Sequence, residues 1–126
     1  MKKILIVIAD YYEDISSSLL KSAKNNLNNF SLKIIRVPGV FEIPVTISKN
    51  IKKYDAFIAL GCVIKGETPH FDFISSASTQ AIMDISVDSK KLIGNGIITC
   101  LNMRQAKARS KKGKEAAKAV ISVLSQ

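Results

Sequence analysis

The chain has 126 residues, of which 47% are hydrophobic, and a formal net charge of +9. This length and apolar content suffice for one core, so we expect a single domain over residues 1–126. The longest uninterrupted apolar run, residues 4–9, is too short to cross a bilayer, and no secretory cleavage pattern follows it. These features argue against a membrane-spanning or exported protein and predict a cytoplasmic one.

Cys62 and Cys100 are the two cysteines, and His70 is the single histidine. Cytoplasmic thiols stay reduced, and the chain has no Cys-x-x-Cys pair, so we expect free thiols and no metal site. The lysines are scattered over predicted helices, with a denser run at 104–118, and aromatic residues do not alternate with them as a base-stacking platform requires. We therefore expect neither a nucleic-acid nor a membrane partner.

Short runs of branched aliphatic residues, typical of parallel strands buried on both faces, alternate with helical stretches. In chain order we expect a strand at 4–9, a helix at 15–28, a strand at 32–37, a helix at 43–52, a strand at 56–60, a helix at 72–86, a strand at 93–99 and a helix from 102 to the C-terminus. This alternation predicts an α/β, three-layer, flavodoxin-like fold, with a four-stranded parallel sheet between helices. Ligands of such sheets bind beyond the carboxyl ends of the strands, so functional residues should follow Ala9, Val37, Leu60 and Thr99.

A Pro-Gly turn after the second strand presents Phe41 and Glu42 at this crevice. An aromatic face beside a carboxylate suits a flat heterocycle that stacks on the ring and donates hydrogen bonds to the acid. Alternatively, Phe41 belongs to the core and Glu42 only complements the start of the next helix.

The segment 61–72 after the third strand reads as a loop that contains His70. An imidazole transfers protons in both directions near neutrality, although a lone histidine is often a packed or surface residue. The glycines and Thr68 could hold a phosphate ahead of the next helix. Cys62 has no acidifying neighbour in sequence, so we interpret it as a pocket wall rather than a nucleophile.

The segments VPGVFEIP (37–44) and GCVIKGETPHFDF (61–73) resemble the two most diagnostic motifs of the 6,7-dimethyl-8-ribityllumazine synthase family. GNGIIT (94–99), followed by a Gln-Ala pair and Arg109, is similar to the family's fourth-strand region. The resemblance implies a cofactor-independent transferase of riboflavin biosynthesis. Such an enzyme condenses 5-amino-6-(D-ribitylamino)uracil with 3,4-dihydroxy-2-butanone 4-phosphate and releases phosphate and water.

The same resemblance implies that His70 is the catalytic proton shuttle. The substrate-binding residues that it implies are Tyr11, Val40, Phe41, Glu42, Cys62, Val63, Ile64, Glu67, Thr68, Asn95, Arg109 and Lys112. Among them, Tyr11 would stack on the pyrimidine, and Glu67, Thr68 and Arg109 would receive the butanone phosphate.

Asn95 matches a position that the family supplies from a neighbouring subunit. The resemblance therefore implies a homo-oligomer, a pentamer or a pentamer-based shell, with active sites between subunits. Riboflavin synthase is a further candidate partner. The chain begins close to its first strand, which favours a bare pentamer without deciding against a 60-subunit shell.

Two departures from the family pattern concern the site. Asp10 stands where many relatives carry an arginine, and the loop between Arg109 and Lys112 is several residues shorter than usual. Lys112 is our choice for the lysine that normally ends this loop.

Two other classes of protein stay open at this point. A flavin-binding carrier of the same fold would hold a phosphate with Ser16, Ser17 and Ser18 and would perform no catalysis. A nucleic-acid-binding protein would rest on the positive charge alone.

Overall fold

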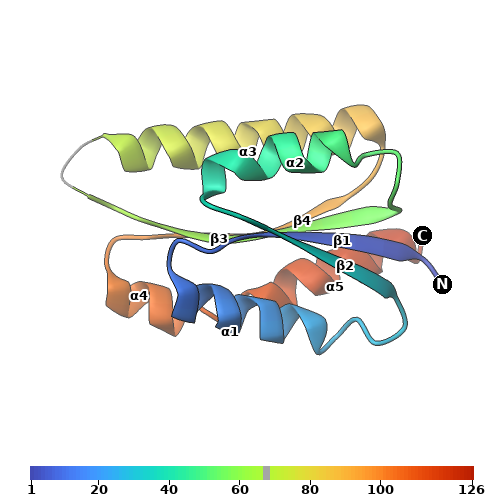
Figure 1. Ribbon diagram of the computed structural model, residues 1–126, viewed down its shortest axis with the longest axis horizontal. Helices are drawn as coiled ribbons and strands as arrows, with labels where there is room; N and C mark the ends of the chain where they lie inside the picture. The colour runs from blue at the N-terminus through green and yellow to red at the C-terminus, as the bar shows by residue number, and fades with distance from the viewer. Residues whose placement is uncertain (67–68) are drawn as a thin grey trace.

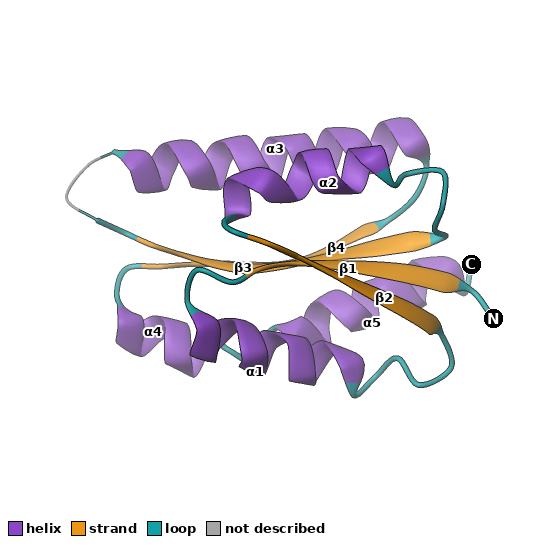
Figure 2. Ribbon diagram, in the orientation of Figure 1, coloured by secondary structure: helices purple, strands orange, loops and turns teal. Residues whose placement is uncertain are grey.

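The computed structural model describes residues 1–66 and 69–126. Four parallel strands form one sheet in the order β2-β1-β3-β4, with helices on both faces (Figures 1 and 2). The strands are β1 (Lys3–Ala9), β2 (Ser31–Val37), β3 (Ala56–Ile64) and β4 (Ile93–Cys100). One face is covered by α1 (Glu13–Lys24), α4 (Met103–Ala108) and α5 (Gly113–Leu124), and the other by the 3₁₀ helix η1 (Val40–Glu42), α2 (Ile43–Lys49) and α3 (His70–Ser89). The predicted three-layer, flavodoxin-like α/β fold is confirmed.

Strand β1 shows why the apolar run is continuous rather than alternating. Ile4, Ile6 and Ile8 belong to the core under α1 and α5, whereas Leu5 and Val7 belong to the core under α2 and α3. Successive side chains of a strand point to opposite faces, and all five are fully buried because both faces are covered. The run therefore reflects a central strand, paired with β2 on one side and β3 on the other.

Strand β3 is longer than predicted, because it continues through residues that we interpreted as loop. It stays paired with β4 as far as Ile64, which lies opposite Cys100. Gly61 suggested a break, but its backbone is part of the strand. A Cβ atom at this position would come within 2.8 Å of Val40 Cγ2, so the glycine permits close packing against η1 rather than a turn.

The predicted helix from 102 to the C-terminus is wrong as a single element. It is divided into α4 and α5 by the segment 109–112, and Asn102 caps α4 by accepting a hydrogen bond from the Gln105 backbone N–H at 2.9 Å. The break lets α5 start with Gly113 against the Leu19 carbonyl of α1, an approach that a side chain would prevent.

Other helix boundaries also shift from their predicted positions. Helix α1 ends at Lys24, although the apolar pattern continued to Leu27. Leu27 is buried in the core from the turn that follows the helix, where its N–H donates to the Lys24 carbonyl. Helix α2 ends at Lys49, and α3 extends over 70–89, so His70 is its first residue. Among the described residues, no helix has both the length and the apolar character needed to span a membrane.

Candidate active site

A cleft of about 640 Å³ opens where the carboxyl ends of β1, β2 and β3 meet the start of α3. This is the position at which ligands of doubly wound sheets bind. The cleft is lined by Tyr11, Tyr12, Gly39, Val40, Phe41, Glu42, Cys62, Val63, Ile64, His70, Phe73 and Ile74. It brings together eight of the residues that the sequence singled out, from four separate segments of the chain. We call it the aromatic cleft.

The loop after β1 places two tyrosine rings at the mouth of the aromatic cleft. The rings of Tyr11 and Tyr12 are stacked, with centroids 4.9 Å apart and an angle of 9° between their planes. Tyr11 is 71% exposed, whereas Tyr12 is half-buried and packs against the core under α1. Burial, followed by the neighbouring Tyr11 and Cys62, raises the pKa of Tyr12. Tyr12 therefore supports one face of Tyr11 with a neutral ring, and the Tyr11 ring remains available to a ligand.

Asp10 has a partner that accounts for its presence in this loop. Its Oδ1 accepts a hydrogen bond of 3.0 Å from Arg36 Nη1, at the end of the adjacent strand β2. The Arg36 side chain is 54% exposed and the Asp10 side chain 36% exposed, so solvent weakens this ion pair and it adds little to the stability of the fold.

The turn after β2 presents an aromatic ring and an acid. Val40 is buried, which fixes η1 against the sheet, while the Phe41 side chain is 68% exposed and Glu42 is half-buried. Phe41 therefore lies outside the core, and the alternative that it is a core residue is wrong. Thr46 Oγ1 donates to the Glu42 carbonyl oxygen at 2.8 Å, which secures the junction with α2, and Glu42 lines the cleft.

The end of β3 forms the inner wall of the aromatic cleft. Cys62 is only 6% exposed, and burial, followed by the neighbouring Cys100 thiol, raises its pKa to about 12. A thiol that keeps its proton at neutral pH is a poor nucleophile, so Cys62 serves here as a small apolar surface. Val63 and Ile64 continue this wall.

His70 is exposed at the first position of α3 and lines the aromatic cleft. Phe73 and Ile74 follow it by three and four residues, so all three lie on one face of the helix. Sequence reasoning missed Phe73, Ile74, Tyr12 and Gly39 as lining residues. The helical spacing from His70 could have indicated the first two once the helix was known to begin there. Glu67 and Thr68 lie outside the described residues.

The remaining predicted residues form a second cleft of about 220 Å³ at β4 and the segment that precedes α5. Asn95, Arg109 and Lys112 line it together with Gly96, Ile97, Ile98, Thr99 and Glu115. Arg109 Nη1 donates to the Thr99 carbonyl at 3.1 Å, and Lys112 Nζ lies 3.4 Å from Glu115 Oε2. We call it the cationic cleft, and within one chain its described lining residues are all different from those of the aromatic cleft.

The carrier interpretation finds little support in the first helix. Ser16 is buried, and its hydroxyl donates to the Ala9 carbonyl at 2.6 Å, so it closes the turn after β1. Ser18 donates to Ser110 Oγ at 3.1 Å. Two of the three serine hydroxyls therefore donate hydrogen bonds within the protein rather than to a ligand.

The fold and the aromatic cleft define a flavodoxin-like α/β protein with a small-molecule site at the carboxyl end of its sheet. The chain matches the 6,7-dimethyl-8-ribityllumazine synthase family over residues 1–126 and belongs to that family, whose members act in riboflavin biosynthesis.

Curated relatives carry the same family name. The 6,7-dimethyl-8-ribityllumazine synthase of Afipia carboxidovorans is 40% identical, with 97% of this chain and 83% of the relative covered. The synthases of Bartonella bacilliformis and Bartonella tribocorum are 45% and 46% identical, with 89% and 86% of this chain and 78% and 76% of those proteins covered. A carrier without catalysis is thus not favoured.

Proposed function

We propose that residues 1–126 act as one lumazine synthase domain that condenses 5-amino-6-(D-ribitylamino)uracil with 3,4-dihydroxy-2-butanone 4-phosphate. The observation that carries the proposal is the convergence of Tyr11, Phe41, Glu42 and His70 on one cleft. Exposed aromatic rings suit the flat pyrimidine, and the Glu42 carboxylate suits its N–H and hydroxyl donors. Val40, Cys62, Val63 and Ile64 supply the walls between these groups.

The cationic cleft supplies what the aromatic cleft lacks. The described lining of the aromatic cleft includes no lysine or arginine, whereas Arg109 and Lys112 are both exposed at the second cleft. A guanidinium group binds phosphate through paired hydrogen bonds, so Arg109 is the group that we assign to the butanone phosphate, with Lys112 beside it. We assign Glu67 and Thr68 to the same phosphate from the family motif.

An active site shared between subunits would join the two clefts. Asn95 and Thr99 are exposed on β4, an edge strand, which leaves room for a neighbour on the cationic cleft. On α2 and α3, Val45, Phe73, Met83 and Val87 expose 58 to 68% of their area. An apolar surface of this kind fits contact with another copy of the chain. We infer a ring in which the aromatic cleft of one subunit faces the cationic cleft of the next, and we propose a homopentamer located in the cytoplasm, with riboflavin synthase as a candidate partner.

The reaction then follows from position and proton transfer. The uracil amine attacks the ketone carbon to form an imine and release water, the phosphate group is eliminated, and ring closure with further loss of water completes the lumazine. His70 takes and returns the protons, while Arg109 holds the departing phosphate. Because both reactants are intrinsically reactive, much of the rate enhancement comes from holding them together. Neither a metal nor a cofactor is needed for any of these steps.

The test is to mix the purified protein with both substrates and follow lumazine absorbance together with phosphate release. We expect equal amounts of the two products at a rate above the uncatalysed reaction. His70→Ala should lower kcat by roughly a hundredfold without abolishing turnover, the lower range for a lost acid-base group. A folded, oligomeric protein with no acceleration would overturn the proposal, and tight binding of flavin mononucleotide without turnover would revive the carrier.

A further inference from the structure

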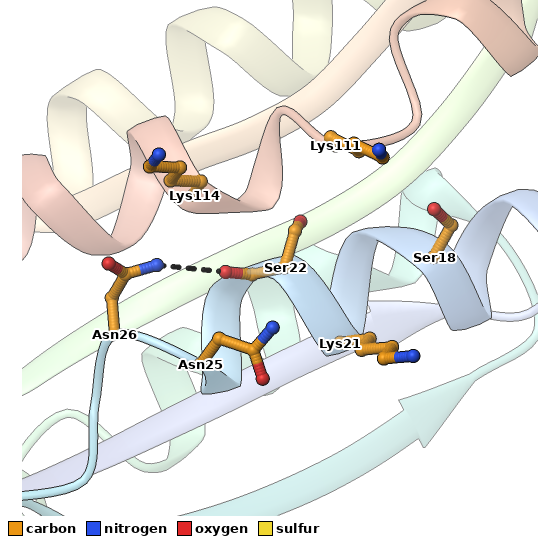
Figure 3. A pocket seen from close by; sticks show the side chains of 7 residues that line it. All are labelled: Ser18, Lys21, Ser22, Asn25, Asn26, Lys111 and Lys114. Carbon is orange, nitrogen blue, oxygen red and sulfur yellow. Dashed lines mark hydrogen bonds between the residues drawn. The ribbon is translucent and has the colours of Figure 1, made fainter.

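A third cleft, of about 550 Å³, lies between α1 and the start of α5, on the sheet face opposite α2 and α3 (Figures 1 and 3). It is lined by Ser18, Lys21, Ser22, Asn25, Asn26, Lys111 and Lys114. None of these residues belongs to the aromatic or the cationic cleft. We call it the lysine cleft.

The shape of the lysine cleft is fixed by packing beneath it. Gly113 is buried against the Leu19 carbonyl and lies close to Ser22 Oγ, so α5 begins in direct contact with α1. The Ser18 hydroxyl donates to Ser110 Oγ at 3.1 Å, which ties the segment before α5 to the same helix. Asn26 Nδ2 donates to the Ser22 carbonyl at 3.1 Å, which holds this side chain against the end of α1 (Figure 3). The backbone of both walls is thereby held in place.

The charge around this cleft is unbalanced. Lys21 borders it from α1, and Lys111 and Lys114 border it from the α5 side (Figure 3). Among the described residues, no acid lines it, and neither of the two ion pairs includes any of these lysines. Three like charges around one cavity repel each other, and a bound anion would relieve this repulsion.

The surrounding sequence strengthens the field. Residues 13–24 and 102–126 carry nine of the nineteen lysines and arginines but only three of the ten acids. The face formed by α1, α4 and α5 therefore has a net positive potential, which concentrates small anions near the cleft.

The lining chemistry narrows the class of ligand. Lysine is a point-charge binder of phosphate, and the Asn25 side chain, which makes no hydrogen bond to the other residues drawn in Figure 3, offers further N–H donors. The described lining of the cleft includes no aromatic side chain, so it offers no stacking platform for a nucleobase. We propose that the lysine cleft is a second anion site, separate from the active site, that binds a small phosphorylated molecule through Lys21, Lys111 and Lys114.

The experiment uses inorganic pyrophosphate as the probe and isothermal titration calorimetry on the intact oligomer. The test variant is Lys21→Gln/Lys114→Gln. The matched control is Lys24→Gln/Lys118→Gln, which removes two charges from the same two helices at positions that do not line the cleft. We expect pyrophosphate to bind the wild-type and control proteins with similar affinity. Its affinity for the test variant should be lower by at least about tenfold, the effect of losing charged hydrogen-bond donors.

Arg109→Ala separates this site from the cationic cleft. We expect it to retain pyrophosphate binding, and we expect the lysine variant to keep the wild-type thermal transition. Absence of binding to the wild-type protein, equal weakening in test and control variants, or loss of binding in Arg109→Ala would each overturn the proposal. Preferential binding of single-stranded RNA, weakened equally by both double variants, would also overturn it and identify a general polyanion surface instead.

Discussion

The aromatic and cationic clefts differ in nearly every property that determines what they bind. The first is built from stacked or exposed rings, one carboxylate and one imidazole at the ends of β1, β2 and β3. The second is small and polar, with Arg109 and Lys112 at the edge strand β4. One suits a neutral, flat heterocycle, and the other suits a phosphate. Under the proposed function, recognition of two unlike substrates is divided between two surfaces of one chain.

The largest change in activity is expected from an experiment that tests whether the aromatic cleft of one subunit works with the cationic cleft of its neighbour. Under limiting substrate, His70→Ala should lose roughly a hundredfold and Arg109→Ala roughly 10 to 100-fold of the wild-type activity. When the two variants are unfolded and refolded together, random pairing in a ring should restore about a quarter of wild-type activity, since that share of the interfaces has both intact halves.

The control for this mixing experiment is each variant refolded alone, with its mass checked by light scattering. Activity that stays at the level of the separate variants, in mixed oligomers of the correct mass, would mean that both residues act within one subunit. The proposed arrangement of the ring would then be wrong, although the proposed reaction could still hold.

A second prediction tests the assignment of the phosphate to the cationic cleft. Arg109→Ala should lower kcat/KM for the butanone phosphate by roughly 10 to 100-fold, because a charged hydrogen-bond donor is lost. Arg109→Lys should recover part of this loss, since the charge remains but the paired geometry does not. The KM for the ribitylaminouracil should hardly change, and a larger effect on that substrate than on the phosphate would contradict the assignment.

A third prediction concerns the ring at the mouth of the aromatic cleft. Tyr11→Ala should raise the KM for the ribitylaminouracil about tenfold, the value expected for one lost stacking contact. Tyr11→Phe keeps the ring and should leave this KM near that of the wild type. Steady-state kinetics with each substrate varied in turn distinguishes the two variants, and equal behaviour of Ala and Phe would remove Tyr11 from pyrimidine recognition.

The smallest expected effect is at Cys62. A pKa raised to about 12 keeps the thiol protonated at pH 7 to 9, so iodoacetamide should modify it far more slowly than a free thiol with the ordinary pKa of about 8.5. The folded state then holds a proton that the unfolded state releases, so stability should fall as pH rises from about 9 towards 12. Peptide mass mapping of the alkylated protein measures the first effect. Rapid labelling at pH 7.5 would show that the thiol is not the inert wall described above.

Several features of the molecule could be predicted from local sequence. Buried strands such as 4–9 can be recognised in the sequence because both faces of a central strand are apolar. The topology rules for parallel strands then determine the layers. The edge at which Phe41, Glu42 and His70 meet could also be predicted, because carboxyl ends of parallel strands share one edge. Their individual roles rest on the family motif and stay proposals.

Other features depended on contacts between distant residues. The length of β3 depended on pairing with β4, and Gly61 looked like a break because its close neighbour Val40 lies elsewhere in the sequence. The division of the last helix depended on Gly113 packing against α1. The sequence by itself determined the order of elements, the layers and the residues with suitable chemistry, because these follow from local pattern and strand topology. Only the tertiary structure separated Arg109 and Lys112 from His70 and gathered Lys21, Lys111 and Lys114, because long-range packing decides which exposed side chains become neighbours.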